Sequence, residues 1–477
     1  MRSAPIIFVI GLAGVIISLA MLFPAIIAFY EEEYDLARTF LISMIISSFM
    51  AGSLMLSGLN SRHQRTRPHD LLLTGLGVWL FVPFLAAIPL TASIQISTFG
   101  DALFESLSAF TTTGASVVLY PELDPLSLTL WRHLICWVGG FWTLLFSVAV
   151  IVPMKVGAIS LSGSPLLQHD ATESVYERLA WPATNIFNVY LAVSIAIIII
   201  QLLLGLDTFN AITLTMSAIS TTGFAPFSDT IMNSIDNRHI AILSLTSLMG
   251  ATAFPLWVGW RGRDRKLFRD VEFRLFIATI LIFTIIMITV QKSDVWHSLI
   301  NTIGLFSTSA FLILKPNSDV SWPILWSILP IAIGGMALST SGGIKFFRCV
   351  AMTKFLEIEL SKLAHPSSVR AAHIGERKLN DNDRQAIWTY FIAFLIIIMT
   401  GTIVFAAFGQ GFEAAWTFTF SFMNNGGSVL RHYGMDAVVA SFNGLEQGLA
   451  MLLMVLGRLE LIIGFVLFSR IFWRFAK

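Results

Sequence analysis

Phe104–Gly114, with the sequence FESLSAFTTTG, is a short half-apolar segment that ends in three threonines and a glycine. Three further segments show this pattern when their ends are aligned: Thr213–Gly223 (TLTMSAISTTG), Ile300–Ala310 (INTIGLFSTSA) and Thr417–Gly427 (TFTFSFMNNGG). A segment of only about 12 residues is too short to cross a bilayer and is typical of a re-entrant or buried helix. The ends recur at intervals of 109, 87 and 117 residues, which indicates one structural unit present four times.

The four segments agree at particular positions and not only in composition. A small residue stands six positions before the end in each: Ser108, Ser217, Gly304 and Ser421. A bulky apolar residue stands four positions before it: Phe110, Ile219, Phe306 and Met423. Apolar segments could resemble one another by composition alone, but four correctly spaced clusters on the same side of the membrane make chance a poor explanation.

Apolar stretches surround these segments, and ten of them reach the roughly 20 residues that a membrane-spanning helix needs. They are 4–29, 38–58, 71–91, 126–153, 183–205, 239–260, 274–291, 322–353, 387–408 and 446–473. The first is too long and lacks the cleavage site of a signal peptide, so we expect a retained helix. Of the 477 residues 56% are apolar and only 12% are charged, about half the charged share of a soluble protein. The sequence therefore predicts an all-α integral membrane protein with ten transmembrane helices.

Basic residues are concentrated in one set of alternating loops, which predicts the orientation because cytoplasmic loops carry the excess of Lys and Arg. These residues are Arg62, Arg65, Arg67, the run 261–269, and Lys354, Lys362, Arg370, Arg377, Lys378 and Arg384. The opposite loops are acidic, with Glu31, Glu32, Glu33, Asp35, Glu122 and Asp124. Ten spans then place both termini in the cytoplasm.

The sequence carries no signature of an enzyme or of a nucleic-acid-binding protein. Thirty Lys and Arg against 29 Asp and Glu leave a net charge of +1, so no basic excess attracts phosphate. The motifs of zinc proteases, P-loop proteins, α/β-hydrolases and dinucleotide-binding folds are absent from the sequence. His133, beside Arg132, is more typical of an interfacial residue than of a metal ligand. We expect neither catalytic residues nor an organic cofactor.

Four polar loops that meet at membrane depth suit the passage of a cation. Irregular backbone is tolerated there only where it is buried in protein or lines a water-filled cavity. A ring of backbone carbonyls can replace the hydration shell of an alkali cation, and glycine can turn its carbonyl inward because it has no Cβ. The C-termini of the four short helices carry partial negative charge and favour a cation at the centre. The sequence thus predicts four helix–pore helix–filter–helix repeats around one pore.

These residues resemble the Trk/Ktr/HKT superfamily of potassium transporters, most closely the bacterial TrkH type. The resemblance covers nearly the whole chain and rests on FTTTGAS (110–116), WVGGFWTLLFSVAVIVP (137–153), STSGGIKFFR (339–348) and GRLE (457–460). It implies a pore of pseudo-four-fold symmetry in each subunit of a homodimer, preceded by two extra N-terminal helices. We divide the chain into an N-terminal extension (1–69) and four repeats (70–182, 183–273, 274–385 and 386–477).

The resemblance also implies which residues bind the ion in the filter, with K+ as the transported and bound metal ion. They are Thr112, Thr113, Gly114, Thr221, Thr222, Gly223, Thr308, Ser309, Ala310, Asn425, Gly426 and Gly427. Ala310 departs from the family, which has glycine there. Two interpretations stay open: Ala310 turns its carbonyl away and weakens potassium selectivity, or Thr308 and Ser309 hold the loop and Ala310 is neutral.

The eighth predicted span contains clusters of glycine and serine that break a helix (Gly334, Gly335, Ser339–Ser341, Gly342, Gly343). Close helix packing is one interpretation. The family implies the other, a gate formed by this stretch. Lys345 either belongs to this gate or lies at the cytoplasmic end. Arg458 lies inside the last span, where an ionisable residue is a functional candidate. The family implies a positive barrier beneath the filter, and the alternative is a structural pair with a buried acid or with carbonyls.

We therefore expect a multi-pass protein of the bacterial inner membrane, surrounded by lipid, that takes up K+. The family implies a cytosolic TrkA-like nucleotide-binding ring as regulator, with the basic loops 261–269 and 354–384 as its docking surface. The alternative functions are Na+ or weakly selective cation transport in the same fold, and a non-transporting receptor or scaffold. Coupling of transport to H+ or Na+ stays open.

Overall fold

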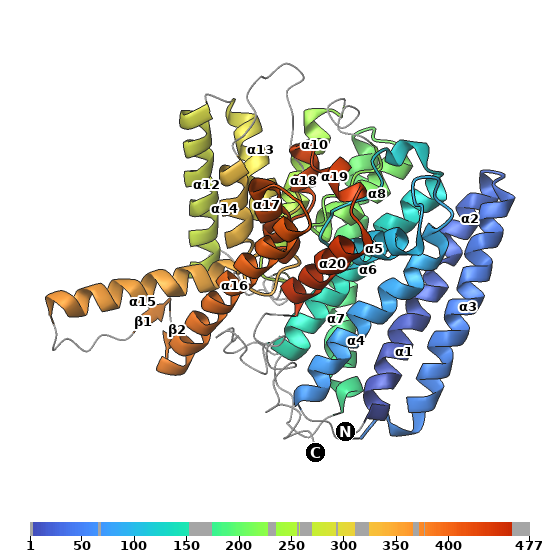
Figure 1. Cartoon of the computed structure of the whole chain (residues 1–477), viewed down its shortest axis with the longest axis horizontal. Helices are drawn as coiled ribbons and strands as arrows, with labels where there is room; N and C mark the ends of the chain where they lie inside the picture. The colour runs from blue at the N-terminus through green and yellow to red at the C-terminus, as the bar shows by residue number, and fades with distance from the viewer. Residues whose placement is uncertain are drawn as a thin grey trace.

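The computed structural model describes residues 3–64, 68–151, 174–227, 235–254, 257, 270–291, 294–310, 324–365, 372–375 and 377–459. Regular structure in these residues is almost entirely helical, as Figure 1 shows. The strands described are β1 (Ala372–Ile374) and β2 (Arg377–Leu379), which form one antiparallel pair. The predicted all-α fold class is confirmed. The basic run 261–269, Arg65, Arg67, Arg370 and Glu460 lie outside the described residues.

Seven helical stretches in the described residues are long and apolar enough to cross a membrane. They are α1 (Ser3–Ala20) with α2 (Leu22–Tyr30), α3 (Tyr34–Gly58), α4 (Pro68–Leu90), α6 (Leu126–Phe146), α7 (Val175–Leu203), α12 (Val271–Gln291) and α16 (Asp381–Ala407). The other three predicted spans correspond to α10 (Asn237–Ala251), α14 (Ile324–Ile333) and α20 (Gly444–Arg458). Because parts of these three spans lie outside the described residues, the count of ten stays a prediction.

The four segments that share the repeated pattern are helices of 12 residues each. They are α5 (Phe99–Phe110), α8 (Thr208–Ile219), α13 (Val295–Phe306) and α17 (Phe412–Met423). Capping residues define where three of them begin, since Thr98, Asp207 and Asp294 accept backbone N–H groups of the first turn. The short elements η1 (Leu59–Ser61), η2 (Pro121–Leu123), η3 (Ser147–Ile151), α18 (Val429–His432) and α19 (Asp436–Ala440) connect the longer helices.

Long and short helices alternate around a closed ring. The 12-residue helix α5 packs against α6, α6 against α8, α8 against α10, and α10 against α13. The series continues through α14, α17 and α20, and α20 returns to α5. An outer helix covers each 12-residue helix: α4, α7, α12 and α16, in that order. The ring gathers the C-terminal ends of four helices from distant parts of the sequence.

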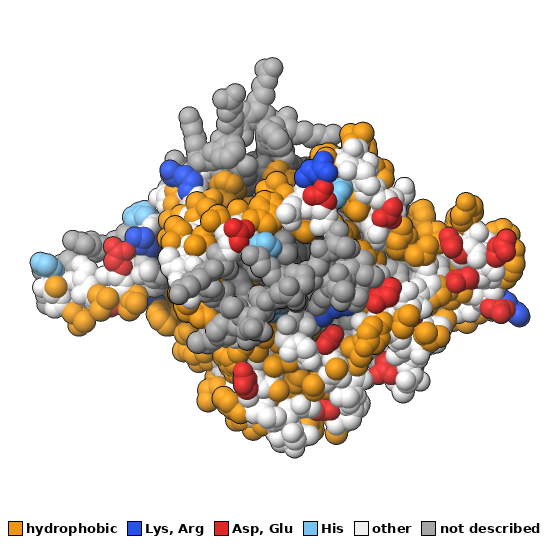
Figure 2. Space-filling model, turned by 90° about the horizontal axis from the view of Figure 1, so that it is seen from above, with side chains coloured by type: hydrophobic (Ala, Val, Ile, Leu, Met, Phe, Trp, Pro, Cys, Tyr) orange, Lys and Arg blue, Asp and Glu red, His pale blue; other side chains and the backbone are white. Residues whose placement is uncertain are grey.

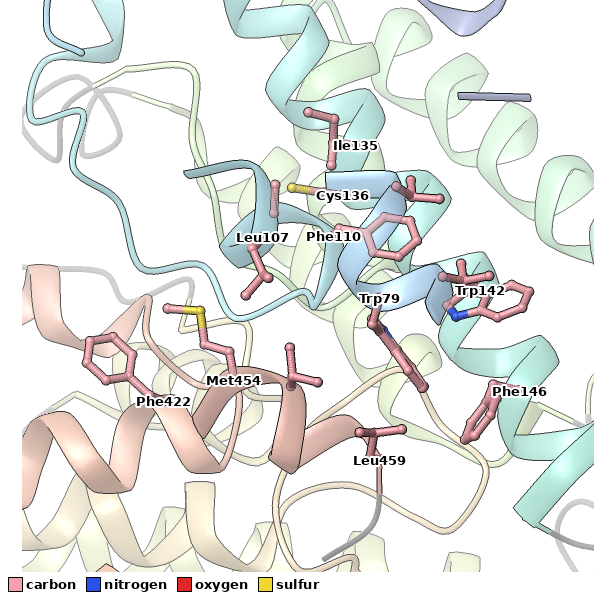
Figure 3. Packing of buried hydrophobic residues seen from close by; sticks show 14 of the residues in the cluster. Trp79, Leu107, Phe110, Ile135, Cys136, Trp142, Phe146, Phe422, Met454 and Leu459 are labelled. Carbon is pink, nitrogen blue, oxygen red and sulfur yellow. The ribbon is translucent and has the colours of Figure 1, made fainter. Parts of the chain in front are cut away.

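The N-terminal helices pack outside this ring, with α1 against α3 and α4 and with α2 against α3 and α6. Behind them, Figure 3 shows a packed aromatic group from α4 and α6. The rings of Trp79 and Phe146 lie 4.7 Å apart, centroid to centroid, in edge-to-face contact. A Cβ at Gly75 would strike the ring of Phe146, so this glycine allows α4 to approach α6 closely.

The N-terminal helices expose large apolar side chains, including Phe29 and Phe49, and so do the outer helices, including Leu281 and Met399. Figure 2 shows hydrophobic side chains along the flanks of the molecule and charged side chains scattered over the face in view. Such apolar flanks would be unfavourable in water, whereas the hydrocarbon core of a membrane solvates them. The molecule is a multi-pass membrane protein.

The eighth predicted span is not one continuous helix. Helix α14 ends at Ile333, irregular backbone follows, and α15 begins at Phe346 and runs to Ala364, projecting from the side of the molecule (Figure 1). The helices that open the predicted repeats also begin somewhat before the proposed boundaries, at Pro68, Val175, Val271 and Asp381. The repeat boundaries themselves stay a prediction.

Candidate functional site

Each 12-residue helix ends at the bulky apolar residue of the aligned pattern, and a polar loop follows. We call the loops 1 (residues 111–114), 2 (220–223), 3 (307–310) and 4 (424–427). The second residue of each loop has left-handed backbone: Thr112 (φ +51°), Thr221 (+58°), Thr308 (+59°) and Asn425 (+48°). This conformation is uncommon for residues other than glycine. The four-fold repetition of the sequence is therefore also a repetition of backbone geometry.

Backbone hydrogen bonds explain why the left-handed turn recurs. In loops 1, 2 and 4 the third amide donates to the helix carbonyl five residues earlier, and the second amide donates to the carbonyl three residues earlier. These two bonds form a Schellman motif, which satisfies carbonyls at a helix end. The first bond of each motif runs from Thr113 N to Ser108 O (2.8 Å), Thr222 N to Ser217 O (3.1 Å) and Gly426 N to Ser421 O (2.9 Å). The small residues of the aligned pattern are the acceptors.

Loop 3 departs from this arrangement at one bond. The amide of Ala310, not that of Ser309, donates to the Gly304 carbonyl, at 3.0 Å. Ala310 nevertheless has left-handed backbone (φ +43°), as do Gly114 and Gly223 (both +79°). This backbone favours the interpretation that loop 3 keeps its shape despite the alanine.

Hydroxyl pairs brace three of the loops from within. The side chains of the first and third loop residues share a hydrogen bond: Thr111 with Thr113 (2.8 Å), Ser220 with Thr222 (2.8 Å) and Ser307 with Ser309 (2.7 Å). In loop 4 the Asn424 side chain donates to Phe420 O instead, at 2.8 Å. Sequence reasoning missed the role of the first residue, although the hydroxyls at positions 111, 220 and 307 were visible in the alignment.

The four loops contact one another in a closed cycle. A Cβ at Gly114 would strike the carbonyl oxygen of Thr222, and one at Gly223 would strike that of Ser309. Loop 3 meets Ser428, the residue that follows loop 4, where Ser428 Oγ donates to Thr308 O (3.4 Å). Loops 4 and 1 meet where Asn425 Nδ2 donates to Thr113 Oγ1 (2.9 Å) and Ser428 N donates to Thr113 O (3.3 Å). Glycine at the ends of loops 1 and 2 is thus required by the neighbouring carbonyl as well as by φ.

The loops are buried, and their ends line a pocket. The side chains of their second and third residues are fully buried in loops 1 to 3, and Asn425 is as well. Beyond the loop ends lies a pocket that is partly open to solvent and is lined in part by Gly114, Gly223 and Gly427. All twelve predicted filter residues therefore converge on one place.

The irregular segment between α14 and α15 (residues 334–345) lies against loops 2, 3 and 4. Thr340 Oγ1 accepts from Thr221 Oγ1 (3.2 Å), and Gly342 N donates to Thr308 Oγ1 (3.0 Å). Gly343 N donates to Asn424 O (3.1 Å), and a Cβ at Gly342 would strike that same carbonyl oxygen. Thr221 and Thr308 therefore contact this segment through their hydroxyl groups. Both residues have left-handed backbone, which glycine would adopt without strain.

Arg458, at the end of α20, joins loop 1 to this segment. Its guanidinium donates to Thr111 O (2.6 Å), Thr340 O (2.7 Å) and Ser341 O (3.2 Å), and also to the carbonyl and hydroxyl oxygens of Thr112. These partners are carbonyl and hydroxyl oxygens, and carbonyl partners are also what the structural alternative for Arg458 expects. Both interpretations of Arg458 therefore stay open.

Lys345 is the last residue of the segment, and its side chain contacts the segment itself. Its ammonium group donates to Ser339 O (3.2 Å) and Ser341 O (2.5 Å). The sequence did not predict a second contact that holds this segment. Glu272 of α12 accepts a hydrogen bond from the Ala337 amide at 3.0 Å. The segment is thus held by a cation at its end and by a carboxylate from a neighbouring helix.

This closed ring of helices with four inward polar loops defines an all-α, multi-pass membrane protein of the re-entrant-loop class. A family model described as TrkH, cation transport protein, matches residues 38–311, which is more than half of the chain. The chain belongs to the TrkH family of cation transport proteins, a family of transporters and not of enzymes.

Curated relatives and a solved structure extend the likeness over the whole chain. The chain is 28% identical to the Trk system potassium uptake protein TrkG of Escherichia coli, over 96% of each chain. It is 28% identical to TrkH of Halomonas elongata, over 98% of each chain. The crystal structure of the potassium transporter TrkH from Vibrio parahaemolyticus matches 99% of this chain and 100% of its own, with a TM-score of 0.86 and 23% identity, and so shares the fold.

Proposed function

We propose that this protein takes up K+ across a bacterial inner membrane through a filter formed by loops 1 to 4. The observation that carries the proposal is the closed cycle of four loops, each entered by a helix C-terminus and each with the same left-handed turn. Carbonyl oxygens packed at such a point can replace the hydration shell of an alkali cation. The relatives named potassium uptake proteins support K+ as the transported ion.

The proposal assigns ion binding in the filter to three residues of each loop. These are Thr112, Thr113, Gly114, Thr221, Thr222, Gly223, Thr308, Ser309, Ala310, Asn425, Gly426 and Gly427. Buried hydroxyls and carbonyls supply the oxygen ligands that hard cations prefer. The four helix C-termini add partial negative charge, which neutralises part of the cost of a dehydrated cation in a buried site.

We assign the gate to the segment 334–345 together with Arg458. Gly342 and Gly343 lie against loops 3 and 4, Lys345 holds the segment, and Arg458 bridges it to loop 1. In this arrangement two cationic side chains, Lys345 and Arg458, lie beneath the filter and oppose the passage of a K+ ion. The arrangement therefore corresponds to a closed state. Opening then requires the segment to leave the loops.

Assembly and regulation form a further part of the proposal: a homodimer with both termini in the cytoplasm and a cytosolic TrkA-like nucleotide-binding ring as partner. The described bases of the 354–384 docking surface are paired with acids of the same region, since Lys354 contacts Glu357 and both Lys362 and Arg384 contact Glu359. Because these bases are paired, docking of the partner there would use the exposed side chains of α15 as well as the net charge of the 354–384 region. Co-purification after charge reversal of Lys354 and Lys362 tests this surface, and undiminished capture would exclude it.

Na+ or weakly selective cation transport is the second candidate, favoured by the departure at loop 3. Ala310 and the shifted hydrogen bond to Gly304 break the equivalence of the four loops. A filter with three equivalent loops offers a weaker preference for the larger, more easily dehydrated ion.

Uptake of rubidium and sodium tests the proposal in a host that lacks its own potassium uptake systems. We expect the chain to restore growth at low K+ and to support Rb+ uptake that excess K+ inhibits. Na+ uptake that equals Rb+ uptake would establish the second candidate. Expression in the membrane without uptake of either ion would refute transport by this chain alone.

A further inference from the structure

A buried ion pair stands beside loop 1, away from the gate. Glu105 of α5 and Arg132 of α6 are both almost completely buried, with 0% and 2% of their side chains exposed. Arg132 Nε donates to Glu105 Oε1 at 2.8 Å, and Arg132 Nη2 lies 2.5 Å from the same oxygen. Neither residue belongs to the predicted filter or to the gate.

The pair holds the stretch of chain that leaves loop 1. Val117 N donates to Glu105 Oε2 (3.0 Å), Ser116 Oγ lies 3.0 Å from Glu105 Oε1, and Arg132 Nη2 donates to Ser116 Oγ (3.0 Å). The same hydroxyl accepts the Val118 amide at 3.0 Å. Residues 116–118 follow Gly114 almost directly, so the ion pair determines where the outer end of loop 1 lies.

Arg132 also contacts the exit of loop 2. Its guanidinium carbon lies 4.9 Å from the centre of the Phe224 ring, and Phe224 directly follows Gly223. One side chain therefore positions the outer ends of two neighbouring loops. Both ends line the pocket beyond the loops, and Arg132 lines it too.

Repeats 2 and 4 show that the fold does not require this pair. Glycines on the following helices, Gly139, Gly250 and Gly457, each lie against the last carbonyl of the 12-residue helix of their repeat (Phe110, Ile219 and Met423) and so mark equivalent positions. Counted from these markers, Glu105 corresponds to Leu214 and Phe418, and Arg132 corresponds to Leu243 and Ala450. In repeat 2 the two leucines lie buried in one apolar cluster.

We propose that Glu105 and Arg132 are positioning residues for the filter, which fix the outer ends of loops 1 and 2 and thereby set the preference between alkali cations. The proposal rests on the proposed function. A charged pair that the fold can replace by leucines contributes little to stability, because burying two charges costs about as much as their attraction returns. Its fork of hydrogen bonds does fix geometry, because a guanidinium holds several acceptors at set angles.

The double variant Glu105→Leu/Arg132→Leu tests the proposal, because it copies repeat 2 and leaves no unpaired buried charge. We expect the purified variant to elute as the wild type does and to unfold at a similar temperature. The Rb+/Na+ flux ratio in proteoliposomes should fall about tenfold, as expected when charged hydrogen bonds are lost. Arg238→Leu, at an exposed arginine of α10 that pairs with Asp236, is the matched control and should keep the ratio.

Two single variants separate positioning from simple charge. Glu105→Gln leaves an unpaired cation and Arg132→Met an unpaired anion beside the cavity, so a charge effect alone would change cation flux in opposite directions while sparing the ratio. Positioning predicts that the Rb+/Na+ ratio falls in both. Arg132→Lys keeps the positive charge but loses the fork of hydrogen bonds. We expect its Rb+/Na+ ratio to lie between that of Arg132→Met and that of the wild type.

A wild-type ratio in a correctly folded double variant would overturn the positioning role and leave the proposed function intact. A wild-type Rb+/Na+ ratio in Arg132→Lys would overturn the role of the guanidinium's fork of hydrogen bonds. Absence of selective Rb+ flux in the wild-type protein itself would instead overturn the proposed function on which this inference rests.

Discussion

At the scale of single residues, the site depends on side chains placed where glycine would be the easier choice. Left-handed backbone costs a residue other than glycine roughly 1–2 kcal/mol. Thr112, Thr221 and Thr308 all adopt it, and the hydroxyl of each contacts Arg458 or the segment 334–345. The strain at these positions is thus offset by hydrogen bonds to Arg458 and to the segment 334–345.

Gly114→Val should abolish selective flux while the protein stays folded. The position needs φ near +79°, and a Cβ there would strike the Thr222 carbonyl oxygen. Gly205→Val is the matched control, because Gly205 has φ +97° but open space around its Cβ position. Rubidium uptake at the wild-type rate by the Gly114 variant would refute the filter assignment.

Ala310→Gly tests the remaining question at loop 3. Since Ala310 already has left-handed backbone, glycine should relieve strain and stabilise the protein by about 1 kcal/mol. If the glycine also lets Ser309 N take over the bond to Gly304, the K+/Na+ flux ratio measured in proteoliposomes should rise. A ratio unchanged at intact expression would show that alanine is tolerated there.

At the scale of structural elements, we propose that the segment 334–345 determines whether the pathway is open. Its backbone is irregular because glycines and serines at membrane depth form no continuous helix, and its polar groups are satisfied by Arg458, Lys345 and Glu272. Arg458 is the one member of this set that also contacts the filter. It therefore couples the position of the segment to loop 1.

Arg458→Gln should raise cation flux about tenfold, because it removes a fixed positive charge and at least one charged hydrogen bond, each worth roughly 1.5–3 kcal/mol. Lys345→Met should raise flux as well. Both cations donate to Ser341 O, so the double variant should gain less than the product of the single effects. Cation flux in proteoliposomes measures these effects. Multiplicative gains would show that Arg458 and Lys345 act independently. Failure of Arg458→Gln to reach the membrane would favour a structural role for Arg458.

The sequence was sufficient for those parts of the site that repeat. Aligned ends located the four short helices and their loops, and the glycine and serine clusters located the break between α14 and α15. Single contacts between distant residues have no periodicity and were not predictable: Glu105 with Arg132, Glu272 with the Ala337 amide, and the start of α7 at Val175 in place of 183. The left-handed threonines were missed because threonine's own preference argues against that backbone.

At the scale of the whole molecule, closure of the helix ring matters most. The ring closes through α20 and α5, which are separated by more than 300 residues, so the four loops meet only when distant parts of the sequence have packed together. The exposed apolar flanks place this ring in a membrane, and the N-terminal helices α1 to α3 pack on its outside.

The relative flux of Rb+ and Na+ through the purified protein in proteoliposomes tests the central claim most directly, because no other transporter is present. We predict Rb+ uptake that external K+ inhibits and that exceeds Na+ uptake by at least about tenfold, which corresponds to roughly 1.4 kcal/mol of discrimination. Equal uptake of the two ions, or uptake of neither by protein that retains its fold, would contradict a potassium-selective filter formed by the four loops.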